Sequence, residues 1–142
     1  MIFFGPKLEP GRIFHFPYDF GPPSGVLEKF LVVVDHTQVF YRLFVINTHR
    51  TDLQEHNSEL RRHVLVIDRA SHPFLDYDSW LNCSELLALR QRDADQHIRE
   101  KPHDKKSKIS TTLRDAILVV IEDSKLYSAD DRDSIKKSLA RV

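Results

Sequence analysis

The sequence predicts a single domain with an α+β or mainly β fold, in which helices follow an antiparallel sheet or small barrel. Runs rich in β-branched and aromatic residues at 30–34 and 38–47 are typical of strands. Two segments near the C-terminus instead show helical spacing of apolar residues. Strands and helices do not alternate, which argues against a doubly wound fold. We expect the sheet or barrel over about residues 9–90 and the helical part over about 110–142 of one domain, 1–142.

The first part of the chain combines turns with strands. All four glycines and five of the seven prolines lie within the first 25 residues, which predicts a turn-rich opening. Within it, RIFHF alternates polar and apolar side chains and predicts a short strand over about 11–16. The run Phe30–Val34 has the length and branching of a strand buried on both faces. Residues 38–47 follow after a tight connection, so we expect a β-hairpin.

The middle of the chain predicts two more strands and a mixed region. Residues 48–62 are polar and lack a clear period, which indicates a long loop or a loop with one helical turn. HVLVIDR at 63–69 predicts a strand, and the alternation over Leu75–Cys83 predicts its antiparallel partner. Residues 84–101 favour a helix or mixed structure, and 102–108 are a polar break.

Two amphipathic helices are expected to close the chain. Thr112 with Asp115, and Ser128 with Asp131, have the spacing of N-terminal capping pairs. In the second helix, acids fill the first turn and bases the last, as the helix dipole favours. The helices are expected within 110–125 and 128–142, with inward positions at Leu113, Ala116, Ile117, Val120 and Ile121 and at Ile135 and Leu139.

Composition limits the kinds of site that the chain offers. Lys plus Arg and Asp plus Glu both total 21, so the net charge is zero and any polyanion site has to be local. The single cysteine excludes an internal disulfide and a cysteine-based zinc cluster. The eight histidines never pair at i, i+4, and no phosphate-binding glycine loop, HExxH or GxSxG occurs. We therefore expect no cofactor and no metal, no membrane span, and a cytoplasmic location.

The stretch PFLDYDSWLNC, residues 73–83, holds two acids and the single tryptophan. On a strand, Asp76 and Asp78 share one face with Trp80. The carboxylate pair suits acid–base work, and it equally suits a solvated strand edge. Trp80 on that polar face is suited to stack a nucleobase or to be covered by a partner. Cys83 falls on the apolar face and is expected to be buried.

Residues 90–114 hold eight Lys or Arg and four acids, a local excess of four positive charges. This segment, which includes Lys105 and Lys106, is the best candidate for a phosphate-facing patch. A solvated polar linker is the alternative, because the segment lacks aromatic residues on which bases stack.

Several segments, taken in order, resemble the MazF/PemK toxin family. EPGRIFHFPYDFGPPSGVLEKFLVVVDH is similar to the family's opening of a Pro/Gly turn, a short strand and a glycine-rich approach to an apolar strand. RLFVINTHR resembles the strand that ends in the family's threonine, and PFLDYDSWLNCSELLAL resembles a later segment. KSKISTTLRDAILVVIEDS resembles the closing helix. The resemblance covers most of residues 9–124 and lies in pattern and order. It implies a small SH3-like β-barrel with a C-terminal helix, often dimeric, that cleaves single-stranded RNA without a metal.

The resemblance also implies site residues. The family's catalytic arginine precedes the apolar strand, and Lys29 occupies the matching position, followed by Phe30 where the family has proline. Thr48 matches the family's threonine, with His49 next to it. Lysine is a point charge where arginine offers a two-donor fork, so the departure at Lys29 bears directly on catalysis.

A metal-free ribonuclease needs a base, an acid and a cation for the phosphorane. Lys29 is the expected cation and Thr48 the expected hydrogen-bond donor to phosphate. The expected acid or base groups are His49, His72 and Asp78. The expected RNA-binding residues are Trp80, Arg50, Lys105 and Lys106.

Two main hypotheses follow. In the first, the protein is an RNA-cleaving toxin that forms a homodimer and pairs with a cognate antitoxin protein. In the second, it is a non-catalytic barrel module that binds a partner protein or nucleic acid. The missing arginine, the zero net charge and the second terminal helix, which is suited to dock a partner, favour the second hypothesis. A third hypothesis, poisoning of a protein target such as a topoisomerase in the manner of CcdB-type toxins, has no feature that selects for it.

Overall fold

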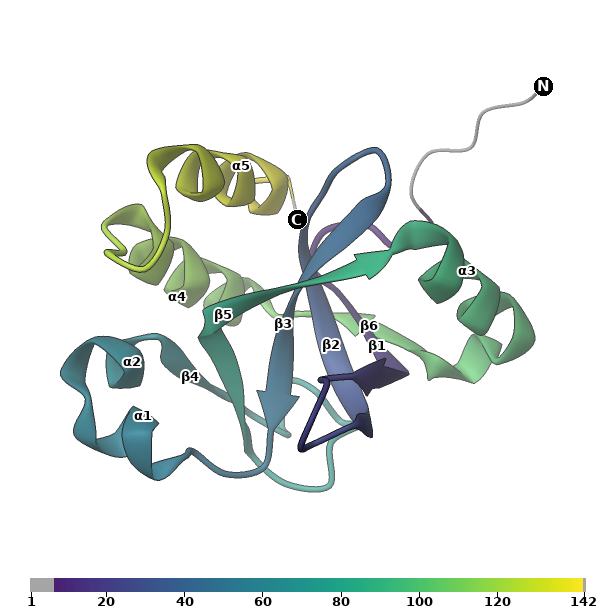
Figure 1. The fold of residues 1–142 in the computed structure, drawn as a ribbon, viewed down its shortest axis with the longest axis horizontal. Helices are drawn as coiled ribbons and strands as arrows, with labels where there is room; N and C mark the ends of the chain where they lie inside the picture. The colour runs from purple at the N-terminus through teal and green to yellow at the C-terminus, as the bar shows by residue number, and fades with distance from the viewer. Residues whose placement is uncertain (1–6, 142) are drawn as a thin grey trace.

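The computed structural model describes residues 7–141 and shows an α+β fold (Figure 1). Within these residues, an antiparallel six-stranded sheet has the order β4-β5-β3-β2-β1-β6. Gly5 of the predicted turn-rich opening, and both ends of the predicted domain, lie outside the described residues. The strands are β1 (Arg12–Asp19), β2 (Val26–His36), β3 (Phe40–Asn47), β4 (Val64–Ile67), β5 (Ser79–Arg90) and β6 (Lys105–Lys108). The helices are α1 (Asp52–His56), α2 (Ser58–Arg62), α3 (Gln91–Glu100), α4 (Thr111–Glu122) and α5 (Ala129–Leu139), with a 3₁₀ turn η1 (Pro102–Asp104).

Both faces of the sheet are covered, with α4 and α5 on one side and α3 on the other (Figure 1). Val32 and Val34 of β2 pack into the cluster that includes α4 and α5. Leu31 and Val33 point the other way, into a cluster that includes Ala94 of α3. These four side chains, which are consecutive in β2, are fully buried. The predicted strand buried on both faces is therefore confirmed, and β3 pairs with it in the predicted hairpin.

The sheet is open, so the predicted SH3-like barrel is not confirmed. β4 and β6 lie at opposite edges, and each has only four residues. The loop after β4 meets the start of α4 instead, because His72 Nε2 accepts a hydrogen bond from the Ser110 N–H over 3.1 Å. Four-residue edge strands offer too short a ladder to close a sheet on itself. A loop contact thus joins the segments that follow β4 and β6.

β5 begins later and ends later than predicted. The strand expected from Leu75 starts at Ser79, so Asp76 and Asp78 lie in a loop rather than on one strand face. The segment from residue 84, predicted to be helical or mixed, continues β5 before α3 begins. Leu86 and Leu87 face opposite clusters of the core. A short run buried on both sides has no period that distinguishes a strand from a helix, which explains the error.

The polar segments, predicted as a loop or a loop with one helical turn at 48–62 and as a polar break at 102–108, contain short elements. Residues 48–62 hold α1 and α2. A capping box begins α1: the Thr51 hydroxyl accepts from the Gln54 N–H over 3.1 Å, and the Gln54 side chain accepts from the Thr51 N–H over 2.9 Å. That Thr-x-x-Gln spacing is a helix-start signal within a segment that was predicted as a loop. The predicted polar break at 102–108 holds η1 and the edge strand β6.

α4 and α5 confirm the two predicted C-terminal helices. Their predicted inward side chains are buried, apart from Ala116, which is half-buried. Ser110 rather than Thr112 caps α4, because its hydroxyl accepts from the Leu113 N–H over 3.1 Å. Ser128 caps α5, at the position of the predicted capping pair. None of the helices in residues 7–141 combines the length and the apolar character that crossing a bilayer requires.

α5 is held against β2, with its apolar side chains in the core. Ile135 and Leu139 are fully buried. Beside them, Asp35 of β2 accepts hydrogen bonds from Ser134 Oγ over 2.7 Å and from Ser138 Oγ over 2.8 Å. The idea that this helix docks a partner through its apolar face is therefore not supported, because the protein's own sheet covers that face.

Candidate functional site

A pocket of about 170 Å³ lies where β2 begins and β3 ends. The loop before β5 forms another wall of this pocket. It brings together Lys29 and Thr48, which are 19 residues apart in sequence, with His15 of β1 and Asp76 of the loop. The remaining lining residues are Glu28, Phe30, Ile46, Asn47, Leu75, Tyr77 and Ser79.

Lys29 belongs to a row of side chains that crosses four strands. Trp80 of β5 lies opposite Asn47 of β3 on one side and Val66 of β4 on the other. Residues directly opposite each other share a sheet face. Lys29 of β2 joins the row, because its Nζ donates a hydrogen bond to Asn47 Oδ1 over 3.0 Å. We call these four residues the Trp80–Lys29 row. Two strand spacings separate its tryptophan and its lysine, about 10 Å.

Arg50 covers Trp80, which changes the expected character of the tryptophan. The Arg50 guanidinium carbon lies 4.4 Å from the centre of the indole ring, in a cation–π arrangement. Trp80 is therefore half-buried rather than exposed. Arg50 also faces Glu55 of α1 at 3.9 Å. A stacked arginine and indole present a flat, positively charged surface, which is the chemistry that single-stranded nucleic acids favour.

Thr48 and His49 follow β3 and are both exposed. Thr48 lines the pocket, whereas His49 is not among the lining residues. The place of Thr48 in the pocket wall is thus compatible with its predicted role as a hydrogen-bond donor to phosphate. The predicted role of His49 stays a prediction without geometric support.

His72 is fully buried, and both of its ring nitrogens are engaged. Nε2 accepts from the Ser110 N–H, so Nδ1 carries the proton and donates to the Asp68 carbonyl over 2.9 Å. An imidazole held in one tautomer by two backbone groups is not free to exchange a proton with a substrate. These contacts give His72 a structural role, and we leave it out of the proposed site.

The two acids of the loop have different surroundings. Asp78 accepts a hydrogen bond from the Arg69 N–H over 2.8 Å, which closes the loop between β4 and β5. It is not among the residues that line the pocket. Asp76, two residues earlier, is exposed and lines the pocket. Asp76 is therefore better placed for acid–base chemistry than Asp78.

His15 is the residue that sequence reasoning missed. It stands in the middle of β1, its ring packs edge-on against Phe30 with centroids 5.1 Å apart, and it lines the pocket. Its Nδ1 faces two carboxylates, Glu28 at 3.5 Å and Asp104 at 3.9 Å. A histidine within an alternating strand is the only sequence signal, and it does not reveal which residues face it.

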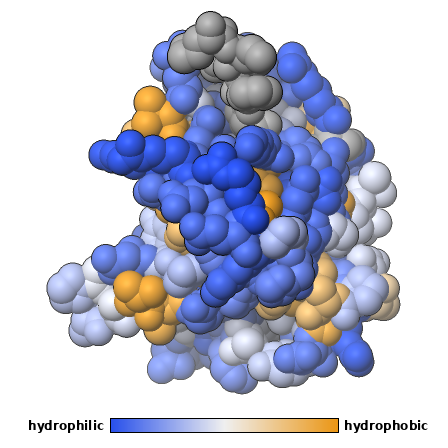
Figure 2. Space-filling model, turned by 90° about the vertical axis from the view of Figure 1, so that its right-hand side faces the viewer, coloured by the Kyte–Doolittle hydropathy of each residue, from blue (hydrophilic) through white to orange (hydrophobic). Residues whose placement is uncertain are grey.

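Lys105 and Lys106 lie on the edge strand β6. Lys105 is exposed, and Lys106 is half-buried, with its carbonyl accepting from Arg12 Nη1 over 2.8 Å. Two acids of the basic segment turn inward: Asp95 accepts from the Tyr41 hydroxyl over 2.7 Å, and Asp104 contacts His97. The face around α3 is mostly hydrophilic, with small and separate hydrophobic spots (Figure 2).

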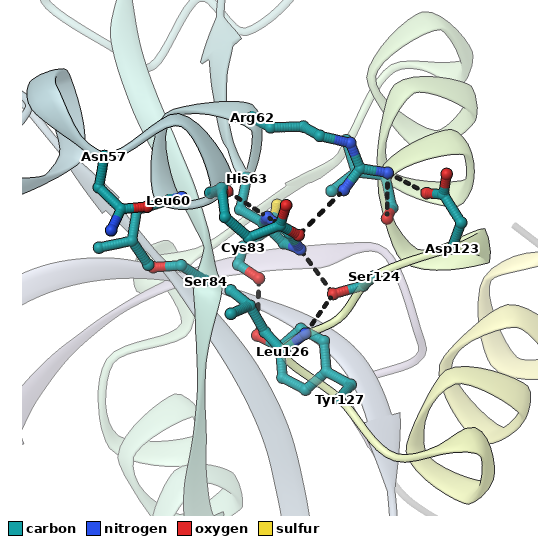
Figure 3. Close-up of polar contacts among 12 residues, drawn as sticks. Asn57, Leu60, Arg62, His63, Cys83, Ser84, Asp123, Ser124, Leu126 and Tyr127 are labelled. Atoms are coloured by element: carbon teal, nitrogen blue, oxygen red, sulfur yellow. Dashed lines mark hydrogen bonds and ion pairs between the residues drawn. The ribbon is translucent and has the colours of Figure 1, made fainter.

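A second histidine–serine contact lies away from the pocket (Figure 3). His63 Nδ1 donates to the Glu59 carbonyl over 2.7 Å, and its Nε2 accepts from Ser124 Oγ over 2.6 Å. Ser124 in turn accepts from the Leu126 N–H over 3.2 Å. The pair resembles part of a hydrolase triad, but His63 is fully buried and Ser124 is 1% exposed. No substrate reaches such a hydroxyl, so the pair joins α2 to the turn after α4.

Comparisons with known proteins do not identify a family. No family model matches the chain, and no curated protein matches it. Residues 7–141 contain no group of three or more His, Cys, Asp or Glu side chains arranged to hold a metal ion.

Proposed function

We propose that the protein is a MazF/PemK-like toxin that cleaves single-stranded RNA at the Lys29 pocket without a metal. One observation carries this proposal: a single pocket is lined by Lys29, Thr48, His15 and Asp76, residues whose side chains include an ammonium, a hydroxyl, an imidazole and a carboxylate. These are the groups that metal-independent RNA cleavage requires. The proposal includes a relationship to that family's SH3-like barrel, a homodimer and a cognate antitoxin protein, which come from the resemblance. It also includes a cytoplasmic location, which comes from the single cysteine.

The chemistry divides among the four side chains. The Asp76 carboxylate removes the proton of the ribose 2′-hydroxyl, and the 2′-oxygen attacks the phosphorus. The bond from phosphorus to the 5′-oxygen breaks, and the His15 imidazolium gives its proton to that oxygen. The products are a 2′,3′-cyclic phosphate and a 5′-hydroxyl. Lys29 and the Thr48 hydroxyl stabilise the negative charge that grows on the phosphoryl oxygens.

The Trp80–Lys29 row supplies binding for the same substrate. A base stacks on the indole and guanidinium planes of Trp80 and Arg50, while the neighbouring phosphate is attracted to Lys29. Stacking of this kind is available to any base. Single-stranded RNA fits this row better than a duplex, because its bases are free to leave the helical stack.

The direct test incubates the purified protein with single-stranded RNA, with and without a chelator. We expect cleavage that survives the chelator and leaves 2′,3′-cyclic phosphate ends. Lys29→Ala should lower kcat by about 10²–10³-fold, the usual cost of one donor to a developing oxyanion. Expression should arrest growth, and Lys29→Ala should relieve the arrest. Lys125→Ala, which removes an exposed lysine elsewhere, is the matched control. Intact RNA and healthy cells with the folded wild-type protein would refute the proposal.

One observation favours the second hypothesis, a non-catalytic module that binds RNA. Lys29 lacks the two-donor fork of arginine, and its ammonium already donates to Asn47. Under this alternative, the protein binds single-stranded RNA through the Trp80–Lys29 row and leaves it uncut. Binding without cleavage in the same assay, with weaker binding in Lys29→Ala, would select it.

A further inference from the structure

One buried carboxylate, that of Asp104, is shared by three histidines. Asp104 ends η1 just before β6 and is 8% exposed. Its Oδ2 lies 2.8 Å from His97 Nε2 and 3.9 Å from His15 Nδ1, and its Oδ1 lies 3.4 Å from His103 Nε2. Burial alone would raise the pKa of Asp104. The hydrogen bond from His97 and the nearby imidazoles outweigh that effect and hold the pKa below its ordinary value. Asp104 is therefore an anion at neutral pH.

His15 is the histidine of this group that lines the pocket. Its side chain is 29% exposed, against 14% for His97 and 78% for His103. Its Nδ1 faces Asp104 from η1 and Glu28 from β2, and the Glu28 side chain is 64% exposed. Within residues 7–141, no hydrogen bond or ion pair involves His15 Nε2. One ring nitrogen thus faces anions, and the other has no polar partner among residues 7–141.

We propose that Asp104 is a positioning residue for His15, keeping the proton on Nδ1 so that Nε2 is the nitrogen that serves the substrate. This rests on the proposed function of the Lys29 pocket. A carboxylate that faces one imidazole nitrogen selects the tautomer and orients the ring, as in hydrolase triads. The 3.9 Å separation is longer than a hydrogen bond, and such contacts shorten when substrate is bound.

His97 makes this arrangement stable. Its hydrogen bond to Asp104 Oδ2 holds the carboxylate at the edge of β1, and its ring packs against Phe16 with centroids 5.0 Å apart. Phe16 follows His15 in β1 and points to the opposite face of the sheet. The Asp104 carboxylate is therefore held in place by His97 and faces His15. Since Glu28 is largely exposed, water screens its charge, and the buried Asp104 has the stronger influence on the His15 ring.

The test measures directly, without RNA, which ring nitrogen of His15 carries the proton. At a pH of about 8.5, where an ordinary imidazole is neutral, nitrogen NMR shifts distinguish an Nδ1–H ring from an Nε2–H ring. His15→Gln assigns the signal. We expect the Nδ1–H tautomer in the wild-type protein and a shift towards Nε2–H in Asp104→Asn. Asp93→Asn, which neutralises an exposed acid of α3, should leave the tautomer unchanged.

Steady-state cleavage of RNA gives the second readout. Asp104→Asn should lower kcat by about 10–100-fold, as loss of an imidazole-orienting partner does elsewhere, with KM unchanged because Asp104 does not contact the substrate. An Nε2–H tautomer in the wild-type protein would overturn the inference, and this measurement does not depend on whether Asp104→Asn folds. An unchanged tautomer in a folded Asp104→Asn protein would overturn it as well. Absence of cleavage by the wild-type protein would instead refute the proposed function, because the tautomer is measured without RNA.

Discussion

Asp35 is the polar anchor of α5, and its removal is the most informative test of the fold. The carboxylate is 3% exposed and accepts from the hydroxyls of Ser134 and Ser138 at 2.7 and 2.8 Å. It also pairs with Arg42 Nη1 at 3.3 Å. Each hydrogen bond to a charged acceptor contributes about 1.5–3 kcal/mol. Arg42 keeps a second partner, Asp131 at 2.9 Å, so Asp35→Ala does not strand the guanidinium.

We therefore expect Asp35→Ala to lower the free energy of unfolding by about 3–6 kcal/mol, because it removes two hydroxyl hydrogen bonds that contribute about 1.5–3 kcal/mol each. With a typical m-value of about 2 kcal/mol/M, the urea midpoint falls by about 2 M. Ser134→Ala and Ser138→Ala should each lose roughly half as much. Asp133→Ala, an exposed acid of the same helix, should change stability by less than about 0.5 kcal/mol. A loss below about 1 kcal/mol in Asp35→Ala, measured by circular dichroism in urea, would show that α5 is held by its apolar side chains alone.

Three further predictions concern other sites. Trp80→Ala should weaken binding of single-stranded RNA by about 5–100-fold, the cost of one stacked base, whereas Trp80→Phe should retain most of the affinity. Equal dissociation constants for the wild-type protein and Trp80→Ala would remove Trp80 from the binding surface. His72→Ala should lower the free energy of unfolding by about 2–4 kcal/mol, because it leaves the Ser110 N–H and the Asp68 carbonyl unpaired. RNA cleavage per folded molecule should not change. A loss of cleavage in fully folded His72→Ala protein would contradict the structural role of this histidine. Burial raises the pKa of the Cys83 thiol, so at neutral pH a thiol reagent should label Cys83 only after denaturant unfolds the protein; rapid labelling of the native state would show that the core opens there.

Local sequence signals predicted most of the secondary structure. The hairpin of β2 and β3 and the two C-terminal helices each have a period or a capping residue that does not depend on distant contacts. The errors occur where burial on both faces removes the period, as at Leu86 and Leu87 of β5. The loop at Asp76 and Asp78 was predicted as a strand because its alternation imitates one, although the ladder begins only at Ser79.

The candidate site likewise combines residues that the sequence predicted with residues that it did not. Lys29 and Thr48 were predicted from the order of segments, and both line one pocket. His72 attracted a catalytic prediction because a histidine in a loop is usually exposed, but its ring is buried between two backbone groups. His15 and Asp104 were not predicted, since 89 residues of chain separate them.

Composition, periodicity and capping signals are properties of neighbouring residues, so the α+β class, the closing helices and the burial of Cys83 follow from the chain read in one dimension. The open edges of the sheet, the cover that Arg50 provides for Trp80, and the sharing of Asp104 among three histidines depend on strand order and register. Those are set by long-range packing of both sheet faces, and a local pattern does not encode which distant segment will lie alongside.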